Sequence, residues 1–394
     1  MTNLRTGWLS VASLAAVIWL GEGWSRPAVA CPFCEAPDVT LTQQVQQSDV
    51  AALVQWVEGK PANREESFAG TTTYEVVDLL HDSSGTLKQG GRFDIVRYRA
   101  GKPGDLFLML GSYTTAIEWG SPIEVSETGY NYIKQAPTKE ASVKERLSYF
   151  LRFLEYSDRM IADDAYAEFA GAPYEDVLLL ADQMPREKLR EWIADPKTPV
   201  NRMGLYGLML GLAGKQDDAQ FLEEKILAPS EGFRIGIDGV MTGYVMIAGE
   251  PGLDLLDREK IGDRTEDFSE HVACAQMLRF LWTYGKGLFP PERLRKSMRL
   301  LVENPKISDL VIPDLARWED WELTQRLIDL YGKEGFDVPY VERKIIHFMW
   351  AAIDSVPKDA DKKPDYVLKA DAFLKKLEAD DPEIVKMAKK TYFR

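Results

Sequence analysis

The sequence has few of the side chains that carry most enzyme chemistry. Its 394 residues include only three cysteines and three histidines, and His81, His271 and His347 share no paired spacing. Neither a G-x-S-x-G nor an H-E-x-x-H pattern occurs. The glycine-rich stretches 206–214 and 236–252 lack the Gly-Lys-Ser/Thr ending of a phosphate-binding loop, so we expect them to serve close helix packing. An enzyme is the less favoured interpretation, and no cofactor is expected.

Long hydrophobic runs are also scarce. The apolar stretch from Trp8 to Leu20 is too short for an ordinary membrane span and, together with Arg5, fits a signal peptide. Ala28 and Ala30 occupy the positions that a signal peptidase reads, so we expect cleavage of residues 1–30 before Cys31 and an extracytoplasmic protein, periplasmic or secreted. A retained anchor helix and a lipid on Cys31 are the alternatives, and membrane contact is expected only with that lipid.

Positive charge is in deficit. The chain has 48 Lys and Arg against 62 Asp and Glu, which gives a formal net charge of −14. This balance repels a phosphate backbone, and we find no basic patch interleaved with aromatic residues, so nucleic acid is not an expected partner. The length suffices for two domains with their own cores, and three cysteines are too few for a disulfide-stapled small fold.

Two of the three cysteines lie in the motif Cys31-Pro-Phe-Cys34. A thioredoxin-like site would need a strand before the motif, and the cleaved chain would have none. A zinc site would need two more ligands, for which His271 and Cys274, one helical turn apart, are the remaining candidates. Cys274 also suits a buried, packed thiol. A structural Cys31–Cys34 disulfide is therefore the favoured interpretation.

The first part of the mature chain is rich in predicted strands. Residues 50–58 form an apolar run, and 71–80, 91–100 and 105–113 are β-branched or aromatic, with turn-forming residues between them. The stretch after Tyr113 can add one or two strands. We expect a small antiparallel β-barrel or sandwich over residues 31–135.

This strand order resembles the netrin/TIMP-like OB fold. The resemblance rests on Thr73–Val76 leading into Leu87–Gly90, on the strand at Ile95-Val96 and on the glycine-flanked "GDLFLMLGSY". In the inhibitor branch of that family the N-terminal cysteine chelates a protease zinc, a role that the resemblance assigns to Cys31. The whole chain also resembles exported proteins of planctomycete type that begin with CPFC and continue into a helical tail.

Helical periodicity replaces alternation after a short linker at 136–142. Leu147, Phe150 and Leu154 share one helical stripe, and 158–171 opens on an acidic cap and ends at glycine. Similar segments recur to the C-terminus in units of roughly 35–45 residues, a pattern that resembles the HEAT-like α-solenoid class. We therefore expect an α+β protein with a helical repeat domain over 143–394, a non-repetitive helical domain being the alternative. Cleavage in the linker is expected to leave two folded pieces.

Two groups of side chains in the helical region suit a functional site. Asp163, Asp164 and Glu168 offer the paired carboxylates of a hydrolase, although solvation of a helix face explains them better. The aromatic residues near positions 282 and 318 can line a ligand groove or pack as core. Candidate ligand-surface residues are Trp282, Trp318 and Trp321.

The preferred function is that of an exported, non-enzymatic scaffold, whose β module and helical solenoid bind another protein of unknown identity. The alternatives are a protease-inhibitor-like or redox protein acting through Cys31 and Cys34, and a hydrolase that uses the helical-domain carboxylates.

Overall fold

The computed structural model describes residues 33, 39–63, 68–229, 232–357, 359–360 and 362–392. The predicted signal peptide, its cleavage site and both Cys31 and Cys34 lie outside these residues. Within them, no helix has the length and hydropathy that crossing a bilayer would require.

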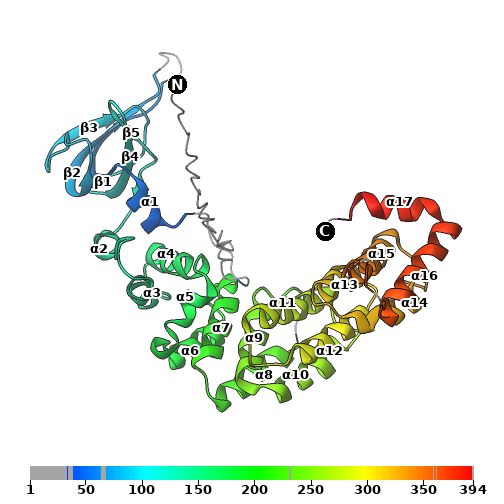
Figure 1. Cartoon of the computed structure of the whole chain (residues 1–394). Helices are drawn as coiled ribbons and strands as arrows, with labels where there is room; N and C mark the ends of the chain where they lie inside the picture. The colour runs from blue at the N-terminus through cyan, green and yellow to red at the C-terminus, as the bar shows by residue number, and fades with distance from the viewer. Residues whose placement is uncertain are drawn as a thin grey trace, which may run out of the picture.

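The strands form one antiparallel sheet, shown at the upper left of Figure 1. The central strand β1 pairs with β2 on one side and β4 on the other, so that Val50 lies opposite both Asp82 and Gly111. The sheet order is β3-β2-β1-β4-β5, and β6 also pairs with β4. Each predicted strand region contains a strand, and the stretch after Tyr113 adds two; the bounds are β1 (Val50–Lys60), β2 (Thr71–Asp82), β3 (Arg92–Ile95), β4 (Leu106–Tyr113), β5 (Ile117–Trp119) and β6 (Ile123–Glu124).

Side chains, and not backbone hydrogen bonds, connect the two ends of this sheet. The ring of Phe93 on β3 stacks on Trp119 of β5 with centroids 4.9 Å apart, and Arg97 donates to Ser121 at 2.9 Å. The enclosed face is apolar; it contains Ala52, Val54, Tyr74, Phe107 and Met109. The described strands therefore form an open, curled sheet, in which β3 and β5 are the two ends and do not pair with each other.

The helices after the sheet follow a curved row from α3 to α17 (Figure 1). Local signals set many of their ends: Asp158 accepts a hydrogen bond from the backbone of Met160 at 3.0 Å, and Gly171 caps the other end of α4, as the sequence predicts. The bounds are α1 (Leu41–Gln47), α2 (Glu127–Gln135), α3 (Val143–Leu151), α4 (Arg159–Ala170), α5 (Tyr174–Leu178), α6 (Arg186–Ala194), α7 (Met203–Ala213), α8 (Gln216–Leu227), α9 (Ile237–Ala248), α10 (Glu250–Leu256), α11 (Phe268–Tyr284), α12 (Pro291–Val302), α13 (Ser308–Arg317), α14 (Thr324–Leu330), α15 (Pro339–Asp354), α16 (Asp365–Asp380) and α17 (Pro382–Lys390).

Glycines join α7 to α9 at very short range. A Cβ on Gly207 would lie 2.5 Å from the Cα of Val240, and a Cβ on Gly211 would lie 2.5 Å from the Cα of Gly243. No side chain fits between two backbones at that separation. The predicted role of the glycine-rich stretches in close helix packing is confirmed.

One hydrophobic cluster crosses the predicted boundary between the domains. Leu53 and Leu108 of the sheet, Tyr130 of α2 and Phe150 of α3 all belong to it. The predicted linker 136–142 lies between α2 and α3, and the carbonyl of Pro137 accepts a hydrogen bond from Gln46 of α1 at 3.1 Å. The sheet and the helices therefore share buried surface on both sides of the linker.

Arginine–carboxylate pairs link helices at nearly regular sequence distances. Arg186 pairs with Asp218, 32 residues away, and Arg234 pairs with Glu270, 36 residues away. Arg279 pairs with Asp314, 35 residues away. Each of these carboxylates is buried. Arg234 and Arg279 each donate to one carboxylate through two nitrogens, whereas Asp218 accepts from Arg186 with one oxygen and from Arg190 with the other; these are strong charge-assisted contacts.

Candidate functional site

The three candidate tryptophans lie near one another but differ in surroundings. Trp318 is only 5% exposed and stacks on the half-buried Trp282, with ring centroids 4.3 Å apart. The guanidinium of Arg295 lies over Trp282 and donates to the carbonyl of Trp318 at 3.0 Å. Trp321 instead stacks beside Tyr366 of α16 and lines an open hollow. Trp318 therefore packs inside the molecule, whereas Trp282 and Trp321 are both half-buried, and Trp321 also lines the hollow.

A tight turn after α13 separates the buried Trp318 from the half-buried Trp321. The N–H of Asp320 donates to the carbonyl of Leu315 and that of Glu319 to the carbonyl of Ala316, which is the Schellman pattern of a helix end. Glu319 occupies the left-handed position of this turn, with φ 55°, where glycine is usual. It is the one non-glycine residue with positive φ in the described part of the chain. Such strain is common where a side chain is needed for function.

The hollow beside Trp321 has a volume of about 430 Å³ and is rich in carboxylates. Four acidic side chains on its rim are exposed or half-buried, and Arg295 and Lys369 are its basic members. The acidic lining residues are Glu292, Glu319, Asp320, Glu322 and Asp365.

Most of these carboxylates already have a cationic partner. Asp320 is buried and accepts from Arg299 at 2.6 Å, and this hydrogen bond raises the pKa of the guanidinium. The same arginine reaches Glu292 at 3.1 Å and Glu322 at 3.1 Å. Glu319 makes no ion pair with any described residue, so its carboxylate at the rim is available to a ligand.

A second hollow continues the first between α14 and α16. It has a volume of about 520 Å³ and shares Gln325 and Lys369 with the hollow at Trp321. Its walls are mostly apolar and half-buried: Ile328, Tyr331, Phe373 and Leu377. We call the two together the Trp321 groove. Its acidic end and its apolar end suit different kinds of ligand side chain.

The sequence alone did not point to the apolar end. Tyr366 and Phe373 lie on α16 and Tyr331 directly follows α14, and each can equally belong to a core. Their grouping depends on how α14 packs against α16. A weak signal is present: α16 carries an aromatic residue close to charged ones, Phe373 before Lys375 and Lys376.

The predicted solvated role of Asp164 and Glu168 is wrong. Both are buried, because α1 covers this face of α4. Asp164 accepts hydrogen bonds from the backbone and the hydroxyl of Thr42, and Glu168 accepts one from Thr40. Asp163 is outside this cluster and pairs with Arg202 at 2.6 Å. The two buried carboxylates contact α1 and no open hollow, which does not suit hydrolysis of a glycoside.

Two of the four predicted metal-ligand candidates, His271 and Cys274, belong to the described residues, and both are buried. Cys274 is fully buried with its sulfur 3.8 Å from that of Met241, and burial raises the pKa of its thiol above the usual range. Burial also lowers the pKa of His271, whose ring bonds the carbonyl of Asp263. Across the described ranges, no three His, Cys, Asp or Glu side chains form a metal-sized group.

Comparison with known proteins adds no relative. No family model matches the sequence, and neither the curated proteins nor the solved structures give a match. The Trp321 groove is therefore the feature of the described residues that bears on function.

Proposed function

We propose that the protein is an exported, non-enzymatic binding protein whose Trp321 groove holds an extended segment of another polypeptide. The segment carries a Lys or Arg at the Trp321 end and apolar side chains at the Phe373 end. The observation that carries this proposal is the continuity of the two hollows, one lined by carboxylates and the other by apolar rings.

The acidic end suits a cationic side chain for two reasons. The faces of Trp321 and Tyr366 attract a cation held over them, by about 0.5–1 kcal/mol at an exposed site. The unpaired Glu319 carboxylate adds a charged hydrogen-bond acceptor at the rim. The net negative charge of the chain, −14, also speeds encounter with a basic partner.

The apolar end suits aliphatic or aromatic side chains. Tyr331 and Phe373 pack edge to face with centroids 5.2 Å apart, and Ile328 of α14 and Leu377 of α16 also line this end. Burying a partner's Leu or Phe there contributes about 1.5–3 kcal/mol. Lys369 and Lys376 flank this end and disfavour a second basic residue.

We also propose that the helices form HEAT-like repeats and that the curled sheet is a netrin/OB-like module. Support for the repeats comes from the buried arginine–carboxylate pairs, which recur at separations of 32, 35 and 36 residues. Support for the sheet comes from its strand order and its single enclosed apolar face.

Export and cleavage before Cys31 belong to the same proposal, and they rest on residues 1–30 of the sequence. The intact mass of the protein from its native envelope tests them. A mass that retains residues 1–30 contradicts cleavage, and an added diacylglycerol indicates a lipoprotein.

Selection of peptides tests the groove. We expect a displayed library of random 12-residue peptides to yield binders with Lys or Arg spaced from Leu, Ile or Phe. Trp321→Ala and Phe373→Ala should each weaken the selected peptide by roughly tenfold or more, which corresponds to about 1.4 kcal/mol. Phe233→Ala is the matched control, because Phe233 is 71% exposed and lies outside the groove. Binders that lose no affinity in either groove variant contradict the proposal.

A further inference from the structure

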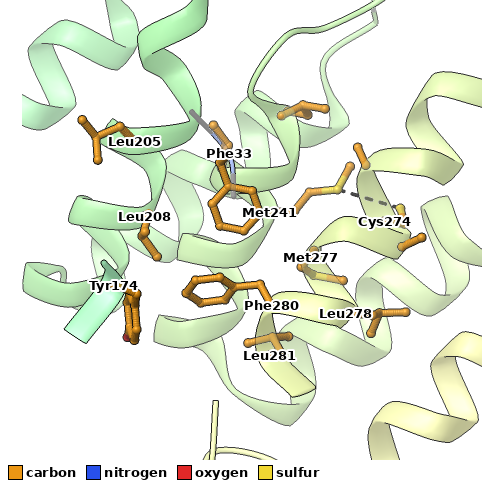
Figure 2. Packing of buried hydrophobic residues seen from close by; sticks show 14 of the residues in the cluster. Phe33, Tyr174, Leu205, Leu208, Met241, Cys274, Met277, Leu278, Phe280 and Leu281 are labelled. Atoms are coloured by element: carbon orange, nitrogen blue, oxygen red, sulfur yellow. Dashed lines mark hydrogen bonds between the residues drawn. The ribbon is translucent and has the colours of Figure 1, made fainter. Parts of the chain in front are cut away.

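The aromatic ring of Phe33 occupies a socket inside the helical domain (Figure 2). The side chain is only 7% exposed, and its ring lies 5.0 Å from that of Phe280 on α11. Phe280 in turn meets Tyr174 of α5 edge to face at 4.9 Å. Three helices that are far apart in sequence thus enclose one residue from the N-terminal segment.

A glycine in α7 makes room for the backbone of Phe33. A Cβ on Gly204 would lie 2.8 Å from the carbonyl oxygen of Phe33 and 2.9 Å from its Cβ. Both distances are shorter than real Cβ contacts allow, so a larger residue would displace the segment. The socket is therefore shaped for the main chain of Phe33 as well as for its ring.

A second anchor holds the same segment where it enters α1. The first-turn N–H of Thr42 donates to Asp164 at 3.1 Å and its hydroxyl donates to the same carboxylate at 2.6 Å. Asp164 thereby caps α1 from another helix, with its negative charge at the positive end of the helix dipole. Tyr132 also donates to Asp164, at 2.9 Å.

The neighbouring carboxylate of Glu168 completes this anchor. It accepts the hydroxyl hydrogen bond of Thr40 and lies 3.5 Å from the guanidinium of Arg146. Thr40 at the same time accepts from the N–H of Gln43 and so caps α1 within its own segment. Both carboxylates are buried, and both belong to α4.

From these two anchors we propose that the helical domain carries a docking site for the N-terminal segment, which behaves as a tethered and releasable peptide ligand. Phe33 fills the aromatic socket, and Thr40 and Thr42 engage the carboxylate pair. The segment contributes one ring, two hydroxyls and one backbone N–H. The helices contribute the partners of these groups, which are Phe280, the space beside Gly204, and the carboxylates of Asp164 and Glu168. Since α1 leads directly into β1, the same docking holds the sheet against α4.

A trans-binding experiment tests this proposal. The probe is a labelled peptide of residues 33–47 with Cys34→Ser to prevent oxidation, and the hosts are the full chain and its Phe33→Ala variant. The wild-type segment competes at an effective concentration in roughly the millimolar range, so the peptide should bind the variant at least about tenfold more tightly. The same peptide with Phe33→Ala should lose that preference. Equal binding to both hosts, or binding to neither, overturns the proposal.

Hydrogen exchange of the wild-type chain provides a second test that needs no variant to fold. We expect the amides of α1 to exchange together through an opening that leaves α7 and α11 protected. If the amides of α1 exchange only when the whole protein unfolds, the segment is not releasable. This outcome contradicts the proposal even if the labelled peptide binds in the first experiment.

Discussion

The two halves of the helical domain bury their surfaces differently. From α3 to α11 the helices are closely packed: glycines bring α7 against α9, and the socket between α5, α7 and α11 is filled by Phe33. From α12 to α17 the helices leave open hollows, including the Trp321 groove and one between α15 and α17. The same helical architecture thus gives a filled half and a hollow half, and the binding of another polypeptide that we propose belongs to the hollow one.

The filled half should respond most to added volume. Gly207→Ala places a methyl group against the backbone of α9 near Val240, where no side chain can move away. We expect a loss of about 3 kcal/mol or more in the free energy of unfolding. Gly171→Ala is the matched control, because its new Cβ would meet only the carbonyl of Ala167 at 3.4 Å. Urea denaturation measures both; equal stability of the two variants would show that α7 and α9 are loosely packed.

One carboxylate from each half should respond to pH in the opposite direction to the other. Burial raises the pKa of Asp238, at the start of α9, to about 6 from 3.8. The folded state therefore binds the proton of the Asp238 carboxyl more tightly than the unfolded chain does. The resulting stabilisation of the folded state is fully present below pH about 4 and is lost as the pH rises through about 6. Asp238→Asn should raise the free energy of unfolding at pH 7 by roughly 3 kcal/mol and leave it nearly unchanged at pH 3.5.

Glu303, at the end of α12, provides the comparison of opposite sign. Hydrogen bonds from Arg326 lower the pKa of Glu303 in the folded state. The ionised carboxylate therefore stabilises the folded state above the pKa that it has in the unfolded chain, and this stabilisation is lost as the pH falls. Glu303→Gln should therefore lower the free energy of unfolding at pH 7 and have little effect on it in acid. Thermal melts of both variants across the pH range check these signs, and parallel curves for the two would contradict them.

The smallest expected stability change tests the strained turn of the hollow half. Glu319→Gly relieves the left-handed backbone and should stabilise the protein by about 1 kcal/mol. The same variant removes the free carboxylate and should weaken a peptide that carries Lys or Arg. Glu319→Gln separates the two effects, since it keeps the strain and removes only the charge. If the Glu319→Gly variant binds such a peptide as tightly as the wild type does, Glu319 does not contribute to peptide binding.

Local features of the chain could be predicted from the sequence. The strand regions follow β-branched and aromatic runs, and the bounds of α4 follow its aspartate cap and its terminal glycine. The glycine-rich stretches correctly predicted close helix packing because glycine has one dominant use inside paired helices.

Contacts between distant segments could not be predicted in this way. Asp164 and Thr42 are 122 residues apart, and nothing near either residue shows that one caps the helix of the other. Trp318 and Trp321 have similar neighbours in sequence, yet the turn at Glu319 sends one inward and the other into the groove. Similarly, the motif that contains Phe33 draws attention to its cysteines, while the structure shows its phenylalanine buried.

Hydrogen exchange with and without the selected peptide tests the central claim most directly, because it observes both halves in one measurement. The account predicts that the peptide slows exchange in α14 and α16, which line the Trp321 groove, and leaves α5, α7 and α9 unchanged. Protection that appears in the closely packed half, with none in α14 or α16, would contradict the assignment of binding to the groove.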